Sequence, residues 1–402
     1  MEKTICTRCI YDDTVPNISF DAEGVCSYCR TIEQMEHEYP NGPAGEEYLQ
    51  KMVAEIKKAG KGKKYDAIIG VSGGADSSYL VHKMHEYGVR LLAVHFDNTW
   101  NSTIATENIH KVLNKLNIDL YTIVVDNKEY DDIYRSFLKS GVKDIECPTD
   151  IGLATTLYKA AEQYGIKYMI EGHSFRTEGV APIGWIYMDG KYIDTIQKQF
   201  GTKKLKTFPN LWFRDQLRWM VLGRIKKVRP LYYMNYDKEA AKKMLAETYG
   251  WQWYGGHHLE NRFTAFFHSY FFPKRWNIDF RIVGYSAFCR DGRMTREEAL
   301  RLMAEEPFIE EGLVDYVKKR LGLSDEEFEH YMTMPKKSYQ DYKTYKTLFE
   351  KLRPFFWLMY KLELVPKSFY MKYTAKQPAE KFDATPNVTA GPRERETTGM
   401  AS

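Results

Sequence analysis

The chain has 402 residues, of which 44% are hydrophobic and 28% are charged, and its net charge is +4. This length exceeds the usual size of one hydrophobic core, so we expect one large domain with smaller appendages. The weak charge gives no support to nucleic acid as a partner, and no stretch reaches the ~18 apolar residues of a membrane-spanning helix. Residues 1–10 are polar and lack the apolar run of a secretory signal, so we expect a cytoplasmic protein.

The first thirty residues contain two Cys-x-x-Cys pairs separated by sixteen residues: Cys6, Cys9, Cys26 and Cys29. This spacing is typical of a structural zinc site with four thiolate ligands, and disulfides are not expected in a reducing cytoplasm. Redox-active or sulfur-carrying thiols and four unliganded cysteines are the alternatives. We predict a zinc-ribbon module over residues 1–35, followed by a helical linker over residues 36–63.

Residues 64–235 alternate between short apolar runs and helical patterns. The predicted strands are residues 66–71, 90–96, 119–125 and 167–171, and the predicted helices are residues 77–87, 107–116 and 152–164. Strands that alternate with helices form parallel sheets with right-handed crossovers. The sequence therefore predicts an α/β domain with a doubly wound parallel sheet, of the kind that binds nucleotides.

A glycine-rich loop at residues 72–78, Ser-Gly-Gly-Ala-Asp-Ser-Ser, joins the first predicted strand to its helix. Two adjacent glycines let the backbone approach a phosphate without Cβ clashes, and a helix that starts here directs free N–H groups at the anion. The loop matches neither of the two commonest phosphate-binding patterns, Gly-x-x-x-x-Gly-Lys-Ser/Thr and Gly-x-Gly-x-x-Gly. A pyrophosphate group fits this cradle.

This strand, loop and helix resemble the PP-loop of the ATP pyrophosphatase superfamily, which includes asparagine synthetase, GMP synthetase and tRNA-thiolating enzymes. The resemblance implies that the loop binds the β- and γ-phosphates of ATP and that Asp76 helps to hold Mg²⁺. It also implies that His95 and Phe96 lie beside the adenine, although a purely structural strand end is the alternative. Gly172-His173 resembles the Gly-His that follows the fourth strand in that superfamily. The implied ATP-binding residues of the loop are Ser72, Gly73, Gly74, Asp76, Ser77 and Ser78.

Beyond Arg214 the sequence pattern is helical, with predicted helices over residues 238–249, 296–304, 313–321 and 324–331. The polar run at residues 255–262 and the cations Lys274 and Arg275 suit the charge of an adenylyl transition state, with a solvated loop as the alternative. The predicted C-terminal parts are a helical substrate-binding region over residues 236–345, a helical segment over 346–377 and a disordered tail over 378–402.

Several motifs together resemble the N-acetyl sugar amidotransferases of bacterial surface-polysaccharide (LPS O-antigen) biosynthesis. Besides the cysteines and the phosphate loop, these motifs are Gly-Gly-His-His-x-Glu-Asn-Arg-Phe-Thr, Pro-Lys-Arg-Trp-Asn-Ile-Asp and Gly-Arg-Met-Thr-Arg-Glu-Glu-Ala, at residues 255–264, 273–279 and 292–299. The resemblance implies that an acetamido group of an N-acetylated nucleotide sugar becomes an acetamidino group. The implied active-site residues are His257, Glu260, Asn261, Arg262 and Lys274, and we add Arg275 as a substrate-binding candidate.

Amide chemistry then gives the expected mechanism. Attack of the acetamido oxygen on the α-phosphate of ATP makes an O-adenylyl imidate and releases pyrophosphate, and ammonia then displaces AMP. Lys274 would stabilise the charge on the phosphates, Asp76 would hold Mg²⁺ on the leaving pyrophosphate, and His257 would move a proton.

Ammonia is expected from a separate glutaminase together with an ammonia-channelling synthase subunit. Neither Cys147 nor Cys289 lies on the Gly-flanked turn that a triad glutaminase needs. Both are expected to be buried, inert thiols, with persulfide transfer in a thiolating enzyme as the alternative. The main alternative function is a PP-loop tRNA-modifying enzyme, acting by thiolation or lysidine formation. A paired catalytic cysteine or a strongly basic appendage would favour this alternative, and the sequence has neither. A third possible function is that of a PP-loop protein that acts only as a scaffold or binding module.

Overall fold

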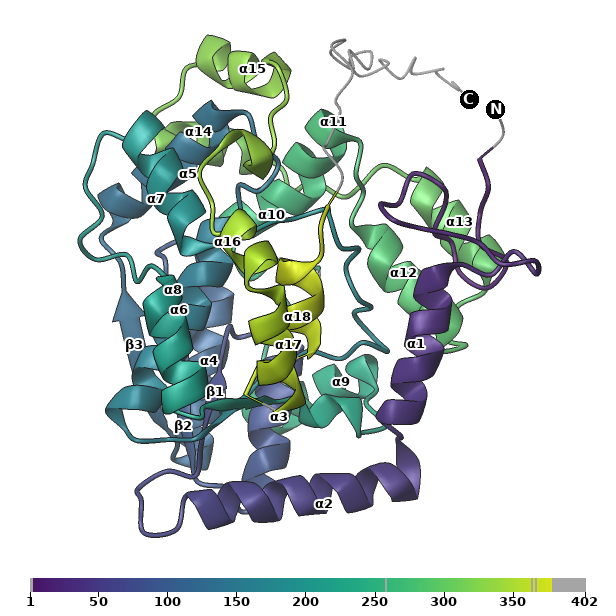
Figure 1. The fold of residues 1–402 in the computed structure, drawn as a ribbon, viewed down its shortest axis with the longest axis vertical. Coiled ribbons are helices and arrows are strands. Elements are labelled where there is room, and N and C mark those ends of the chain that lie inside the picture. The colour runs from purple at the N-terminus through teal and green to yellow at the C-terminus, as the bar shows by residue number, and fades with distance from the viewer. Residues whose placement is uncertain (1–2, 257–258, 363, 366, 378–402) are drawn as a thin grey trace, which may run out of the picture.

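A computed structural model describes residues 3–256, 259–362, 364–365 and 367–377 (Figure 1). At its centre, residues 67–228 form a parallel five-stranded sheet with the strand order β3-β2-β1-β4-β5. The strands are β1 (Ala67–Gly70), β2 (Leu91–Asp97), β3 (Asp119–Val124), β4 (Tyr168–Ile170) and β5 (Lys226–Val228). The predicted doubly wound parallel sheet is therefore confirmed.

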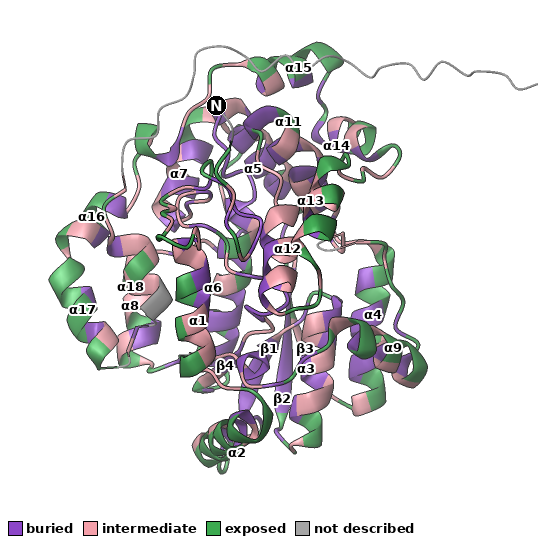
Figure 2. Ribbon diagram, turned by 90° about the vertical axis from the view of Figure 1, so that its right-hand side faces the viewer, coloured by how far each residue is buried: buried purple, intermediate pink, exposed green. Residues whose placement is uncertain are grey.

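Successive side chains of the central strands belong to two different hydrophobic cores. In β1, Ile68 packs into the core on one face, whereas Ala67 and Ile69 pack into the core on the other. The neighbouring strand β2 divides in the same way, with Leu92 on the first face and Leu91 on the second. Side chains of a strand alternate between faces, and a parallel sheet has both faces covered. Figure 2 accordingly shows the middle of the sheet as buried.

Helices cover both faces of the sheet. Residues of α2, α3, α4 and α9 pack on one face, and residues of α5, α6 and α7 pack on the other. These helices are α2 (Gly42–Ala59), α3 (Ala75–Glu86), α4 (Thr103–Leu116), α5 (Asn127–Ser140), α6 (Cys147–Gln163), α7 (Gly190–Phe200) and α9 (Lys238–Tyr249). Polar N-cap side chains begin several of them: Ser102 accepts a hydrogen bond at the start of α4, Asp126 at α5 and Asp237 at α9.

The remaining helices belong to the N-terminal module and to the C-terminal half. They are α1 (Ser27–Glu38), α8 (Phe213–Leu217), α10 (Arg262–Phe266), α11 (Phe272–Trp276), α12 (Arg281–Arg290), α13 (Arg296–Ala304), α14 (Leu313–Leu321), α15 (Asp325–Thr333), α16 (Lys346–Lys351), α17 (Arg353–Lys361) and α18 (Lys367–Thr374). A π-helical segment, η3 (Phe267–Phe271), connects α10 to α11. In Figure 1, α12 and α13 lie beside the N-terminal segment.

The structure differs from the sequence prediction in one strand and several helices. The prediction has four strands, and β5 lies beyond Arg214, where the pattern reads as helical. This strand is Lys226-Lys227-Val228 at the edge of the sheet, so it lacks the apolar run of a buried strand. Lys227 is accommodated because its Nζ pairs with Glu171 at 2.6 Å. The prediction also omits α5 and α7, whereas α9, α13 and α14 begin and end at the predicted residues.

The predicted domain boundaries, after residues 35, 63, 235, 345 and 377, stay predictions. The predicted tail, residues 378–402, lies outside the described residues. In the part of the chain that the structure describes, no helix has both the length and the apolar character that crossing a membrane requires.

Candidate active site

The glycine-rich loop lies between β1 and α3, as predicted. Gly73 has φ of +81°, and a Cβ added to it would lie 2.1 Å from the carbonyl oxygen of Ala105, so no larger residue fits. Trp251 Nε1 donates a hydrogen bond to the Gly73 carbonyl at 3.0 Å and fixes the loop from behind. Gly74 is the N-cap of α3 and has no capping side chain, so the first N–H groups of the helix are left for an anion.

The space above the loop suits a phosphate group. A Cβ at Gly74 would approach the hydroxyls of Ser72 and Tyr254 to 3.2 Å, and thus enter the space that the loop encloses. Ser77 follows in the first turn of α3 and donates to the Gly74 carbonyl at 3.3 Å, while Ser78 is 4% exposed. Backbone N–H groups and serine hydroxyls are the donors that pyrophosphate oxygens need, so the loop fits the predicted ligand.

Asp76 is held by two side chains that the sequence analysis did not single out. Its carboxylate accepts a hydrogen bond from Tyr236 at 2.6 Å and pairs with Lys238 Nζ at 2.7 Å. Burial alone would raise the pKa of Asp76, but Lys238, Tyr236 and a hydrogen bond with Glu178 hold it below its ordinary value. Asp76 and Glu178 together offer the hard oxygen donors that Mg²⁺ prefers, so these two carboxylates fit the predicted metal.

The position of Lys238 in its helix is unusual for a lysine. It occupies the first position of α9, where the positive end of the helix dipole disfavours a cation. The ion pair with Asp76 explains why a lysine is stable at this helix start.

The end of β2 presents His95 and Phe96 to the same region. His95 is buried, its Nδ1 donates to the Val71 carbonyl at 2.8 Å, and its Nε2 accepts from Asn101 at 3.2 Å. Burial lowers the pKa of His95, so the ring is neutral. Phe96 packs so closely on α6 that a Cβ at Gly152 would lie 2.4 Å from its ring.

Gly172 and His173 follow the end of β4, as predicted. A Cβ at Gly172 would lie 3.4 Å from the backbone of Ser77, so this residue backs the phosphate loop. His173 Nδ1 accepts from Tyr232 at 3.0 Å, and its Nε2 donates to the Gly179 carbonyl at 3.0 Å. Burial of the ring by its neighbours and the charge of Arg229 lower the pKa of His173 to about 4. His173 is thus a neutral ring, and 39% of its side chain remains exposed.

A cavity of about 490 Å³ joins the phosphate loop to the C-terminal half of the chain. This volume is in the range of small-molecule sites. Five of the predicted site residues line it: Ser72, His95, Phe96, Glu260 and Asn261. The fold therefore brings together the loop after β1, the end of β2 and the start of α10.

Asn261 ties the start of α10 to the end of β2. Its Oδ1 accepts from the backbone N–H groups of Phe263 and Thr264, at 3.0 and 3.2 Å, and so caps the helix. Its Nδ2 donates to Asn98 at 2.9 Å and to Asn101 at 3.3 Å. The amide is fixed from both sides, which places it at the wall of the cavity.

Glu146, which the sequence analysis did not single out, is a buried carboxyl group in the cavity wall. Its oxygens accept hydrogen bonds from Thr149 at 2.7 Å, Tyr134 at 3.1 Å and Thr264 at 2.9 Å. Burial outweighs these bonds and raises the pKa of Glu146 to about 8. A carboxyl that titrates near neutral pH inside a cavity is a candidate for proton transfer.

The structure does not bring the predicted cations to this cavity. Arg262 pairs with Glu310, and Lys274 Nζ pairs with Glu306 at 3.1 Å. Arg275 is 4% exposed and donates to backbone carbonyls, including that of Met334 at 3.0 Å. The substrate role of these residues stays a prediction. His257 lies outside the described residues.

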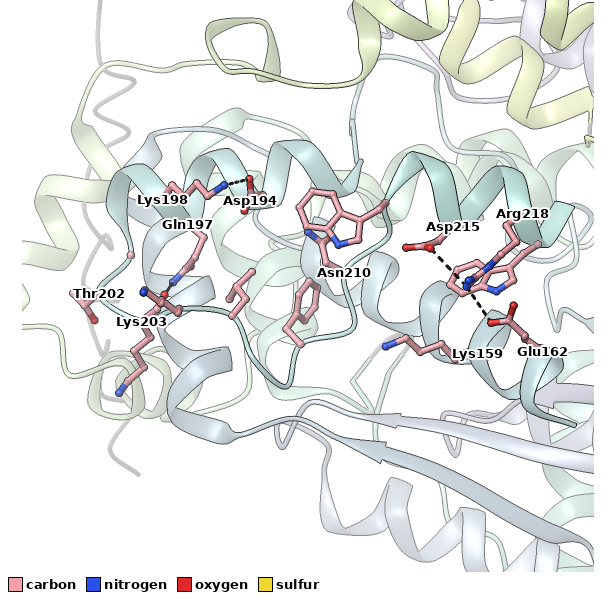
Figure 3. A pocket seen from close by; sticks show the side chains of 16 residues that line it. Lys159, Glu162, Asp194, Gln197, Lys198, Thr202, Lys203, Asn210, Asp215 and Arg218 are labelled. Carbon is pink, nitrogen blue, oxygen red and sulfur yellow. Dashed lines mark hydrogen bonds and ion pairs between the residues drawn. The ribbon is translucent and has the colours of Figure 1, made fainter. Parts of the chain in front are cut away.

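A second cavity, of about 690 Å³, lies between α6, α7, α8 and the connection after α7 (Figure 3). Its charged side chains are largely paired: Lys198 contacts Asp194 at 2.7 Å, and Arg218 contacts Glu162 at 3.1 Å. None of the predicted site residues in the described part of the chain lines it. The smaller cavity, which contains the phosphate loop, is therefore the candidate active site.

The four N-terminal cysteines form a compact cluster. Their sulfur atoms lie within 4.8 Å of one another, all four side chains are buried and none forms a disulfide. Arg290 of α12 donates to the sulfurs of Cys29 at 3.2 Å and Cys9 at 3.3 Å. Backbone N–H groups also point at sulfur, as from Cys26 to Cys6 at 3.2 Å. Four converging sulfurs with such donors are the ligand set of a tetrahedral zinc site.

Comparison with protein families gives two matches. Residues 66–192 match the tRNA methyl transferase HUP domain, and residues 260–353 match the C-terminal domain of WbpG-like LPS biosynthesis proteins. The chain combines a HUP domain with a WbpG-like C-terminal domain. Both the predicted PP-loop superfamily and the resemblance to surface-polysaccharide enzymes are confirmed at this level. The HUP match contains β1 to β4, the phosphate loop and the implied ATP site, whereas β5 lies beyond it. The WbpG-like match begins at Glu260, in the cavity wall.

Individual relatives match part of the chain. An uncharacterized protein of Methanocaldococcus jannaschii is 25% identical over 170 residues, covering 42% of this chain and 58% of the relative. A tRNA-specific 2-thiouridylase of Proteus mirabilis is 30% identical over 128 residues, covering 28% of this chain and 35% of that enzyme. The chain thus spans less than two thirds of these relatives. Among solved structures, the NMN synthetase of Francisella tularensis is 16% identical, with 70% of this chain and 97% of that chain covered and a TM-score of 0.35.

Proposed function

We propose that the chain is an ATP-dependent amidotransferase that converts the acetamido group of an N-acetylated nucleotide sugar into an acetamidino group. One observation carries the proposal. The cavity that contains Ser72 of the phosphate loop is also lined by Glu260, Asn261 and Thr264 of the WbpG-like domain. An ATP site and a domain of LPS biosynthesis thus share one site, as an enzyme that activates a sugar with ATP requires.

The proposed reaction has two steps. The acetamido oxygen attacks the α-phosphate of ATP, forming an O–P bond while the bond to pyrophosphate breaks. Ammonia then attacks the imidate carbon, AMP leaves with the oxygen, and the attacking nitrogen loses a proton to give the amidine. The loop N–H groups and serines hold the leaving pyrophosphate. Mg²⁺, held by Asp76 and Glu178, would neutralise charge on that leaving group.

The remaining residues have roles that follow from their surroundings. Lys238 keeps Asp76 ionised, and we add it to the predicted site. Glu146 lies in the cavity and, with the predicted His257, is a candidate to accept the proton that ammonia loses. The predicted action of Lys274 on the phosphates would require its ion pair with Glu306 to open.

The cysteine cluster is proposed to hold one structural zinc ion, since four buried sulfurs leave no ligand position for substrate. Ammonia is proposed to come from a separate glutaminase and a channelling subunit. Cys147 is fully buried, and burial raises the pKa of its thiol well above the ordinary value. Such a thiol is a poor nucleophile, which supports a partner as the source of ammonia.

tRNA modification is the second candidate, because the HUP model is described as that of a tRNA methyl transferase and one relative is a 2-thiouridylase. The WbpG-like domain favours the sugar substrate.

The two candidates are separated by one set of assays on the purified chain. With ATP, Mg²⁺, ammonium and a panel of N-acetylated nucleotide sugars, we expect AMP, pyrophosphate and an acetamidino product seen by mass spectrometry. Glutamine in place of ammonium should give no product. A parallel assay supplies tRNA with ATP, Mg²⁺ and either a sulfur donor or lysine. Thiolated or lysidine-containing tRNA in that assay, without any sugar product in the first, would reject the proposal.

A further inference from the structure

Lys372 lies in the wall of the candidate active-site cavity. It comes from α18, which lies beyond the residues matched by either family model. In the described part of the chain, its ammonium makes no hydrogen bond and no close ion pair, and it lies over the ring of the adjacent Tyr373, 5.7 Å from the ring centroid. Among the described residues that line the cavity, it is the only lysine or arginine.

The surroundings of α18 hold Lys372 in place. The ring of Tyr373 lies 6.1 Å from that of Tyr187 and 5.7 Å from that of Phe349. Lys346 Nζ of α16 donates to the Tyr373 carbonyl at 3.1 Å. The helix therefore packs on the main core through the residue next to Lys372, and the position of the ammonium is built into the fold.

An unpartnered cation in a partly buried position has an energetic cost that a ligand would offset. Burial lowers the pKa of Lys372, although the charges of Asp150 and Asp144 oppose this effect. A buried charge is normally paired within the protein, whereas this one faces a cavity that must admit an anionic nucleotide and a nucleotide sugar. An anionic oxygen of a reactant is the partner that this chemistry fits.

We propose that Lys372 binds an anionic oxygen of a reactant in the cavity, so that α18 forms a wall of the active site and contributes to its specificity. The proposal rests on the proposed function only in that the cavity binds ATP and an anionic acceptor. Two sources supply the same chemistry: the phosphates of ATP, or an acidic group on the acceptor.

A footprint of the intact wild-type protein tests binding without turnover. Acetic anhydride labelling followed by mass spectrometry gives the acetylation rate of Lys372 relative to that of Lys361, an exposed lysine on α17. The probes are the α,β-methylene analogue of ATP with Mg²⁺, UDP-N-acetylglucosamine and its uronic-acid form. Protection by the ATP analogue identifies phosphate as the ligand, and protection by the uronic-acid form alone identifies an acidic acceptor group. Either result stands even when no amidine forms. Unchanged labelling with all three probes overturns the proposal.

Kinetics of three variants complete the test. We expect Lys372→Met to raise the KM of the protecting reactant 10- to 100-fold, with a thermal transition like that of wild type, and Lys372→Arg to restore part of the loss. Lys361→Met should behave as wild type. KM values of a folded Lys372→Met variant that stay within twofold of wild type for both reactants would also overturn the proposal.

Discussion

At the scale of single residues, the candidate site contains charged side chains that are largely buried and paired with one another. The side chains of Asp76 and Lys238 are only 15% and 14% exposed. Removing one member of such a pair leaves the other charge uncompensated, which costs more than the pair itself contributes. The loop residues are readable from the sequence because they are contiguous. Lys238 could not be predicted as a site residue in this way, because its partner Asp76 lies far away in the chain. Its only sequence signal is that a lysine is unfavourable at a helix start.

Replacing Lys238 by methionine should lower the rate of pyrophosphate release on the order of 100-fold, because the position and ionisation of Asp76 depend on that cation. Lys243→Met is the matched control, since this lysine is on the same helix and its side chain is 78% exposed. The measurement is coupled pyrophosphate detection with ammonium and substrate present. Equal rates for the two variants would contradict the assigned role.

The carboxyl of Glu146 gives a prediction for pH dependence. Its pKa is raised from 4.5 to about 8 in the native state, so between these values the native state binds more protons than the unfolded state. Its contribution to stability is therefore present at low pH and is lost as pH rises toward 8. Glu146→Gln has no carboxyl to titrate, so its stability should not fall in this way. Between pH 5.5 and 8, the difference in free energy of unfolding between Glu146→Gln and wild type should therefore shift in favour of the variant, on the order of 2 kcal/mol.

Urea unfolding at the two pH values measures this difference. Glu311→Gln, at an exposed position, is the control and should show no such change. A difference between Glu146→Gln and wild type that is the same at both pH values would show that the carboxyl titrates normally.

At the scale of elements, two of the predicted strands are buried on both faces, whereas β3 is also predicted although it is largely exposed at the edge of the sheet. The two buried strands are β1 and β2, and β5, with its two lysines, is not buried and escaped prediction. The continuous helical stretch from α10 through η3 to α11 escaped prediction for a different reason. Its run of phenylalanines is buried on several sides, so the sequence lacks the polar stripe that marks a surface helix.

In the loop between β1 and α3, we expect a single methyl group added at Gly73 to have a large effect on stability and on ATP binding. Gly73→Ala adds a Cβ that meets the Ala105 carbonyl at 2.1 Å, in addition to the cost of a positive φ. Gly62→Ala is the matched control, because Gly62 has φ of +75° but no neighbour within 4 Å. We expect Gly62→Ala to cost about 1 kcal/mol of stability without changing ATP binding.

Gly73→Ala should destabilise the protein further and raise the Kd for an ATP analogue at least tenfold. Calorimetric titration and thermal melting measure the two effects. Comparable ATP affinity in both variants would mean that the loop does not hold the phosphates.

At the scale of the whole molecule, the site is assembled from segments that no local pattern connects. The sequence alone predicts the phosphate loop, the cysteine cluster and the polar run that includes Glu260 and Asn261. It does not predict that Glu146 and Lys372 line the same cavity, because that depends on how α6 and α18 pack. The predicted roles of Lys274 on the phosphates and of Arg275 in substrate binding stay predictions. In the structure Lys274 pairs with Glu306, and Arg275 donates to backbone carbonyls.

The N-terminal cluster connects to the C-terminal half through Arg290, and zinc should therefore stabilise both. Elemental analysis of protein purified without added metal should give about one zinc per chain. Cys9→Ser should lose the metal and lower the thermal transition, whereas Cys289→Ser should keep the metal. No zinc in the wild-type protein, with all four thiols titratable in the folded state, would refute the site.

Trp185 contacts both the N-terminal cysteine cluster and the candidate active-site cavity. It packs with the cysteines of the N-terminal cluster, is 5% exposed, and also lines the active-site cavity. A shortened chain that begins after residue 35 would keep the whole sheet and the phosphate loop. It would remove the cysteine cluster from one side of this indole and leave Phe280 and Val283 on the other. A complete cavity therefore needs more than the nucleotide-binding domain, and the contribution of Trp185 to the tryptophan emission should respond both to metal loss and to ligand entry.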